Sequence, residues 1–199
     1  MGLEFEDEQH LQNYIAKVMR DQGWNVKTEA KPKETKNWKH SYRVDILASR
    51  KVNQKYYKIG LELKHLKKNI KGAKIGEAVR QITDQYRGKN YKCPTTGKYE
   101  PFWMFAYLPY YSQKDIADEL KANNRFIANF IQKWGVGHGY LKENCCTVKF
   151  RSDANAVTLF NRYSKEDQTN KEYTRKRLAD CNYKKSKKMV KRRIEGDFR

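Results

Sequence analysis

Residues 42–64, YRVDILASRKVNQKYYKIGLELK, contain two runs in which apolar and polar side chains alternate, separated by a polar turn. Alternation with a period of two is typical of a β-strand, so the runs predict a β-hairpin with its turn in 50–55. In the first run Asp45 stands between Val44 and Ile46. Because successive side chains of a strand point to opposite faces, Asp45 faces away from both neighbours.

The second run places an acid and a lysine on one face of its strand. Leu61 and Leu63 share one face, and Glu62 and Lys64 share the other. Burying a carboxylate or an ammonium without a partner is costly, so an apolar strand that carries both indicates a specific role for them. The hairpin therefore predicts that Asp45, Glu62 and Lys64 lie close together.

These residue types suit metal-assisted hydrolysis of a phosphodiester bond. Two carboxylates bind a divalent cation through oxygen ligands. A lysine beside them can orient or deprotonate a water molecule and offset the negative charge that develops on a phosphate. The alternative is an ordinary hairpin with a cross-strand salt bridge, which stabilises a fold by only ~0–1 kcal/mol when exposed.

The arrangement resembles the PD-(D/E)XK nuclease superfamily, in which an acid on one strand is followed by Glu/Asp-X-Lys on the next. Here these residues are Asp45 and Glu62-Leu63-Lys64, with sixteen residues between the two acids. Val44 stands where the superfamily name has proline, at a position that is loosely kept. The resemblance covers about residues 4–108 and reaches 150 at most.

The superfamily usually adds an acid on a preceding helix and a polar residue on a following helix. Glu8 fits the first position, with Glu4, Glu6 and Asp7 as competitors, and Gln81 fits the second, with Gln85 as the weaker choice. In some of these families the second helix carries Q-x-x-x-Y. Tyr86 follows Gln81 by five positions instead of four, so this form is off by one.

The resemblance implies an α/β fold: a restriction-endonuclease-like core with a central mixed sheet of four or five strands flanked by helices. It also implies a metal-dependent nuclease that acts on DNA and leaves a 5′-phosphate. Mg²⁺, for which Mn²⁺ could substitute, would bind Asp45, Glu62, the backbone carbonyl of Leu63 and Glu8. Lys64 would position the attacking water, and Gln81 would assist near the metal or the phosphate. Many relatives act as homodimers, a point that this sequence leaves open.

The rest of the chain predicts the elements around the hairpin. A buried strand should end at Pro109, and GVGHG at 135–139 should form a turn that includes His138. Periodicity predicts helices over 6–21, 74–86 and 112–133, strands over 24–28, 102–108, 139–141 and 146–150, and a helical piece over 154–163.

The charge predicts a nucleic acid as the partner. The 199 residues carry a net charge of +20, and residues 171–199 hold twelve Lys or Arg against four Asp or Glu. We therefore expect a nuclease domain over 1–170 and a basic C-terminal arm over 171–199. Aromatic and basic side chains near the hairpin are expected to contact DNA, unless they form only solvated loops: Trp38, Lys39, Arg43, Lys67, Lys68, Lys71 and Lys74.

Other features narrow the class of protein. The sequence has no apolar run of the ~20 residues that a membrane span needs and no N-terminal apolar signal, so we expect an intracellular location, in the cytoplasm or nucleoid, or in a host cell. The four cysteines show no C-x-x-C spacing, which disfavours a zinc site. The alternative function is a non-catalytic DNA- or RNA-binding protein on a nuclease-like scaffold.

Overall fold

A computed structural model describes residues 3–33, 42–52, 55–66, 73–111, 128–150 and 156–161. The named elements are α1 (Glu8–Asp21), β1 (Asn25–Ala30), β2 (Val44–Val52), β3 (Lys55–Leu66), α2 (Ala73–Arg80), the π-helical segment η1 (Gln81–Tyr86), β4 (Asn90–Lys92), β5 (Tyr99–Pro101), β6 (Phe105–Tyr111), β7 (Gly137–Lys142), β8 (Cys145–Lys149) and β9 (Ala156–Asn161). Residues 128–133 are also helical.

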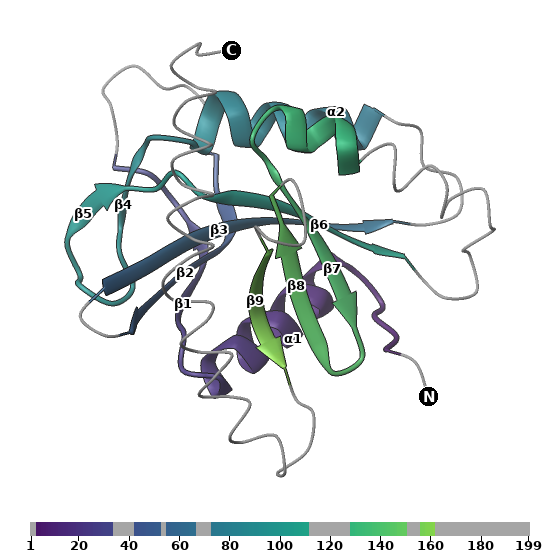
Figure 1. Cartoon of the computed structure of the whole chain (residues 1–199), viewed down its shortest axis with the longest axis horizontal. Coiled ribbons are helices and arrows are strands. Elements are labelled where there is room, and N and C mark those ends of the chain that lie inside the picture. Colours follow the sequence, from purple (N-terminus) through teal and green to yellow (C-terminus); the bar gives the residue numbers. More distant parts are fainter. Residues whose placement is uncertain are drawn as a thin grey trace.

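The fold is a large curled sheet of seven strands in the order β1-β2-β3-β6-β7-β8-β9, with few helices (Figure 1). The β3–β6 and β6–β7 pairs are parallel, and the other pairs are antiparallel. The predicted restriction-endonuclease-like core, with four or five strands flanked by helices, is therefore wrong. The sheet continues through β7, β8 and β9 and curls into a half-barrel.

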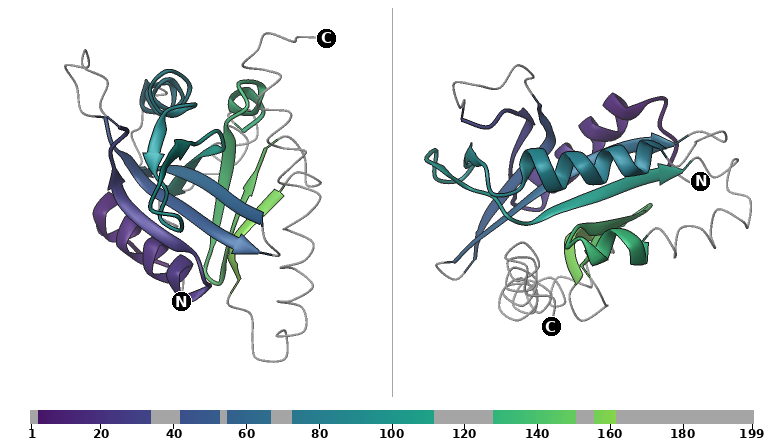
Figure 2. Two further views of the ribbon diagram at one scale, coloured as in Figure 1. Left: turned by 90° about the vertical axis from the view of Figure 1, so that its left-hand side faces the viewer. Right: turned by 90° about the horizontal axis from the view of Figure 1, so that it is seen from above.

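Helix α1 covers one face of the sheet, and α2, η1 and residues 128–133 lie on the other, as Figure 2 shows. The side chain of Asp7 caps α1 by accepting a hydrogen bond of 2.7 Å from the His10 N–H. The apolar stripe of α1 packs against Ile46 and Leu61, which belong to the same buried cluster. On the opposite face Tyr86 and Phe105 belong to a second buried cluster.

Several predicted elements differ from the structure. Pro109 does not end its strand but lies inside β6. The β6–β7 pairs stop at Tyr107, so Pro109 lies beyond them, where a missing N–H is tolerated. Residues 154–163 form no helix in their described part, which is strand β9. The Trp24 indole N–H donates 2.8 Å to the Leu159 carbonyl oxygen and ties β9 to the start of β1.

Residues 137–139, predicted as part of a turn, are the first half of β7. A Cβ on Gly139 would lie 2.2 Å from Leu108 Cδ1, so glycine is needed there for the close approach of a neighbouring strand. Of the predicted helix over 112–133, the stretch 112–127 lies outside the described residues. The arm over 171–199 and the boundary at 170 also lie outside them. No helix in the described ranges is long and apolar enough to cross a membrane.

Candidate active site

The β2–β3 hairpin brings Asp45 next to the Glu62-Leu63-Lys64 segment. Ile46 pairs with Leu61, so the next step along the two antiparallel strands sets Asp45 beside Glu62. One oxygen of Asp45, Oδ2, accepts a hydrogen bond of 2.7 Å from the Leu63 N–H. The backbone of β3 therefore fixes the position of the first acid.

Glu62 is almost fully buried, with 2% of its surface exposed. Its Oε1 lies 2.9 Å from Lys64 Nζ, and its Oε2 accepts a hydrogen bond of 3.1 Å from the Tyr86 hydroxyl. Both oxygens therefore have a partner that fixes the orientation of the carboxylate.

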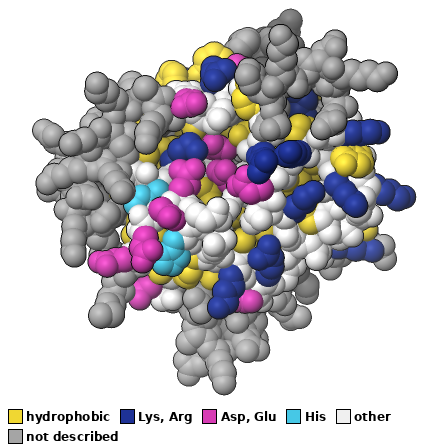
Figure 3. Space-filling view, turned by 180° about the vertical axis from the view of Figure 1, so that it is seen from behind, with side chains coloured by type: hydrophobic (Ala, Val, Ile, Leu, Met, Phe, Trp, Pro, Cys, Tyr) yellow, Lys and Arg dark blue, Asp and Glu magenta, His cyan; other side chains and the backbone are white. Residues whose placement is uncertain are grey.

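The first residue of α1 completes the acidic cluster. Glu8 Oε1 lies 3.3 Å from Lys64 Nζ, and Glu8 Oε2 accepts a hydrogen bond of 3.3 Å from the His65 N–H. Asp7, a competitor in the sequence, instead caps the helix. The structure thus brings together Glu8, Asp45, Glu62 and Lys64, and Figure 3 shows acidic side chains gathered near the middle of one face.

Burial and mutual repulsion make the two inner acids hard to ionise. Burial, reinforced by the charge of Glu62, raises the pKa of Asp45 to about 8. Burial also raises the pKa of Glu62, although the Lys64 ammonium opposes the shift. For Lys64, burial lowers the pKa, but the charges of Glu62 and Glu8 outweigh it and raise the pKa well above its ordinary value. Lys64 is therefore a fixed positive charge at neutral pH.

The π-helical segment η1 explains the offset of Tyr86. The Arg87 N–H donates 3.1 Å to the Ile82 carbonyl oxygen, a bond that spans five residues. In such a turn, residues five apart share a face, so Gln81 and Tyr86 stand in the relationship that residues four apart have in an α-helix. The five-residue spacing was visible in the sequence. The sequence did not show that a π-helical turn would accommodate the extra residue, or that Tyr86 would contact Glu62.

Two glutamine side chains, those of Gln81 and Gln85, lie on η1. Gln85 is 5% exposed, and Gln81 is half-buried. The side-chain oxygens of both lack a hydrogen-bond partner within the described part of the chain. These two oxygens are therefore available to a water molecule or a ligand.

The donor set suits a hard divalent cation. Asp45 and Glu62 supply oxygen atoms, and a cation between them would relieve the burial and repulsion that raise their pKa values. Within the described ranges, no group of three or more His, Cys, Asp or Glu side chains is arranged to hold a metal ion. Glu8 is turned toward Lys64 and the backbone of His65.

A row of buried polar groups leads away from Glu62 across the sheet. Glu62 pairs with Tyr107 on β6, and Tyr107 pairs with His138 on β7. Both are fully buried, and neither the Tyr107 hydroxyl nor the His138 ring nitrogens has a hydrogen-bond partner in the described ranges. Burial lowers the pKa of His138 to about 4, so its ring is neutral. His138 lies in strand β7, so its prediction as a turn residue is wrong.

Most of the predicted DNA-contacting residues cannot be placed. Trp38, Lys39, Lys67, Lys68 and Lys71 lie outside the described residues, as does the side chain of Lys74. Arg43 is exposed, and its Nη1 lies 3.8 Å from Glu29 Oε2. An exposed pair at this distance is weak, so Arg43 remains able to contact a phosphate.

Comparison with family models, with curated proteins and with solved structures gives no match for this chain. The chemistry of the site is therefore the basis for the functional inference.

Proposed function

We propose that the protein is a metal-dependent nuclease that hydrolyses phosphodiester bonds of DNA at the site formed by Asp45, Glu62 and Lys64. The observation that carries this proposal is the pair of carboxylates held on adjacent strands, with a charged lysine 2.9 Å from Glu62. The resemblance of these residues to the D…E-X-K pattern supports the same chemistry.

The proposal assigns a role to each group. Asp45, Glu62 and the backbone carbonyl of Leu63 would hold Mg²⁺ or Mn²⁺, with Glu8 as an additional ligand. The bound ion would supply Lewis-acid activation of water and stabilisation of charge on the phosphate. Lys64 would position the attacking water and offset negative charge, since its raised pKa keeps it protonated. Gln81, with Gln85 four residues later, would bind water or a phosphate oxygen.

The net charge of +20 supports a polyanionic substrate. Charge alone attracts DNA and RNA equally, so the choice of DNA follows the resemblance. Action as a homodimer, which would present a site to each strand, belongs to the same proposal.

A cleavage assay tests the proposal. Plasmid, single-stranded and branched DNA are incubated with the protein in EDTA, Mg²⁺ or Mn²⁺, alongside Glu62→Gln and Asp45→Asn. Glu143→Gln is the matched control, because Glu143 is an exposed acid on the β7–β8 turn. We expect metal-dependent products from the parent and the control, and none from the other variants.

Two outcomes would overturn the proposal. Equal cleavage by Glu62→Gln would show that the site is not the source of the activity. Binding of DNA or RNA without cleavage in either metal would support the alternative, a non-catalytic nucleic-acid-binding protein.

A further inference from the structure

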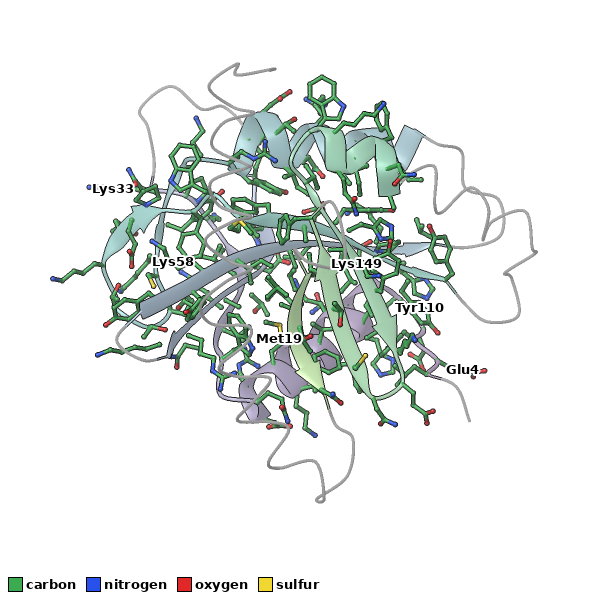
Figure 4. The ribbon with its side chains drawn as sticks, viewed as in Figure 1. Glu4, Met19, Lys33, Lys58, Tyr110 and Lys149 are labelled. Carbon is green, nitrogen blue, oxygen red and sulfur yellow. The ribbon has the colours of Figure 1, made fainter. Side chains whose placement is uncertain are left out.

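In the described part of the chain, three lysine–ring pairs involve residues of the β2–β3 hairpin or residues in and beside the small β4–β5 sheet. Lys33 Nζ lies 5.6 Å from the centre of the Tyr99 ring, Lys51 Nζ lies 5.7 Å from that of Tyr56, and Lys58 Nζ lies 5.4 Å from that of Phe102. The sequence had not indicated a binding role for any of these residues. Figure 4 labels Lys33 and Lys58 on the side of the molecule where β4 and β5 lie.

Specific contacts hold β4 and β5 against the main sheet. The hydroxyls of Thr95 and Ser49 lie 2.7 Å apart, and the Lys33 N–H donates 2.8 Å to the Asn90 carbonyl oxygen. Lys58 Nζ also lies 2.7 Å from Glu100 Oε2. The β4–β5 unit thus packs on the face of β2 and β3 that carries Ser49 and Lys58.

The acidic site lies on this same face. Along β2, strand alternation places Lys51 on the face of Ser49 and Asp45. Along β3, it places Tyr56 on the face of Lys58 and Glu62. Lys51, Tyr56 and Lys58 therefore lie on the face of the hairpin that carries the acids, separated from them along its length.

Two of the three rings, those of Tyr56 and Tyr99, are open to solvent, and the charge around them is positive. Tyr99 is 52% exposed and Tyr56 is 41% exposed. The one acid of 89–101, Glu100, is paired with Lys58. Lys92 and Lys98 are exposed, and Figure 3 shows Lys and Arg side chains gathered to one side of the acidic cluster.

We propose that this hairpin surface, formed by Lys33, Lys51, Tyr56, Lys92, Lys98 and Tyr99, binds unpaired nucleotides of a nucleic-acid strand. The tyrosine rings would stack on bases, and the lysines would contact phosphates. The surface then holds a single-stranded segment on the face that carries Asp45 and Glu62. This inference rests on the proposed function, because it supplies the substrate class of the same site.

Duplex DNA suits the surface less well, because paired bases are stacked on one another and cannot stack on a tyrosine ring. The two tyrosines therefore predict a preference for single strands, whereas the lysines act on single strands and duplexes alike.

Fluorescence anisotropy in EDTA tests this inference with a labelled single strand and a duplex of equal length. We expect Tyr56→Ala with Tyr99→Ala to weaken single-strand binding by about 30-fold or more, and duplex binding by less than about 3-fold. Lys33→Glu with Lys98→Glu should weaken both, and should lower the slope of log K against log salt by roughly 0.7 per lost contact on the single strand.

Matched controls come from other parts of the molecule. Trp134→Ala removes a ring that is 54% exposed near helical residues 128–133, and Lys17→Glu reverses an exposed charge on α1, on the opposite face. Both should bind like the parent. Parent-like single-strand affinity in the double tyrosine variant, or an equal loss in Trp134→Ala, would overturn the inference.

This binding experiment separates the inference from the proposed function, because EDTA removes the metal that cleavage needs. If the parent cleaves DNA but the tyrosine variant binds normally, the hairpin surface is refuted and the nuclease stands. If binding depends on the tyrosines but no metal supports cleavage, the surface stands and the nuclease is refuted.

Discussion

The hydroxyl of Tyr86 lies 3.1 Å from Glu62 Oε2 and 2.9 Å from the carbonyl oxygen of Arg43. Tyr86 therefore contacts Glu62 on β3 and the residue that directly precedes β2. Burial and the nearby charge of Glu62 raise the pKa of Tyr86 far above its ordinary value, so the hydroxyl remains a donor. Through this bond, η1 fixes the carboxylate that the proposed mechanism needs.

We predict that Tyr86→Phe keeps the fold but lowers the cleavage rate by about 10-fold or more. A hydrogen bond to a charged group contributes about 1.5–3 kcal/mol, and its loss frees Glu62 to rotate toward Lys64 alone. Rates at saturating Mg²⁺ check this, with Tyr91→Phe as the control, because Tyr91 is a buried neighbour whose hydroxyl bonds the Tyr86 carbonyl oxygen at 3.4 Å. An unchanged rate would show that Tyr86 does not orient Glu62.

A one-residue deletion tests the role of the π-helical segment. Removing Asp84, which is exposed, should convert η1 to an ordinary α-helix and leave Gln81 and Tyr86 on the same face. We expect cleavage to persist and the melting temperature to stay level or rise, as the hydrogen bonding becomes regular. Loss of cleavage in a folded variant would mean that the π-helical geometry itself is required.

Asp45→Asn should stabilise the metal-free protein while abolishing cleavage. The folded state raises the pKa of Asp45 to about 8, so ionising this acid opposes folding, and stability falls as the pH rises from about 4 to about 8. Asparagine carries no charge and can still accept the Leu63 N–H bond. Melting curves in EDTA should show a larger gain at pH 9 than at pH 5, with exposed Asp84→Asn as the control. A lower melting temperature at pH 9 would contradict this.

Lys64→Met should separate metal binding from turnover. An ammonium is no metal ligand, so calorimetric titration with Mn²⁺ should still detect binding, whereas cleavage should fall by orders of magnitude. Without metal the variant should melt earlier than the parent, because Glu62 and Glu8 lose the cation that lies 2.9 Å and 3.3 Å away. If the variant loses Mn²⁺ binding as completely as Asp45→Asn does, the roles assigned to these residues are wrong.

The hairpin and its acids were predictable because apolar and polar side chains alternate along both strands, although the structure buries both faces, with Ile46 on one face and Leu47 and Glu62 on the other. Alternation alone then fixes which face carries Asp45, Glu62 and Lys64. Among four N-terminal acids, the resemblance favoured Glu8. In the structure Glu8 lies beside Lys64, whereas Asp7 caps α1.

The second half of the sheet was harder to predict, for physical reasons. AVTLF at 156–160 is too short to separate a helical period from a strand, and its antiparallel pairing with the preceding strand, β8, decides the outcome. Gly139 looked like a turn residue, but it serves the close approach of Leu108. The contact between Tyr86 and Glu62 depends on one extra residue in a helix, which periodicity does not reveal.

Buried His138 predicts an acid sensitivity that a matched variant should lack. Its ring centre lies 6.2 Å from that of Tyr107 and 4.6 Å from that of Tyr140, and burial lowers its pKa to about 4. A free histidine has a pKa of about 6.5, so the unfolded chain binds the extra proton first as the pH falls. The contribution of His138 to stability is therefore full above about pH 6.5 and decreases steadily down to about pH 4.

His138→Phe keeps a ring of similar size but cannot be protonated. We expect the melting temperature of the parent to fall more between pH 7 and pH 5 than that of His138→Phe. His10→Phe, at an exposed histidine on α1, should follow the parent. Parallel pH profiles for the parent and His138→Phe would show that the ring is not held neutral in the folded protein, and that the polar row beside Glu62 is accessible to protons.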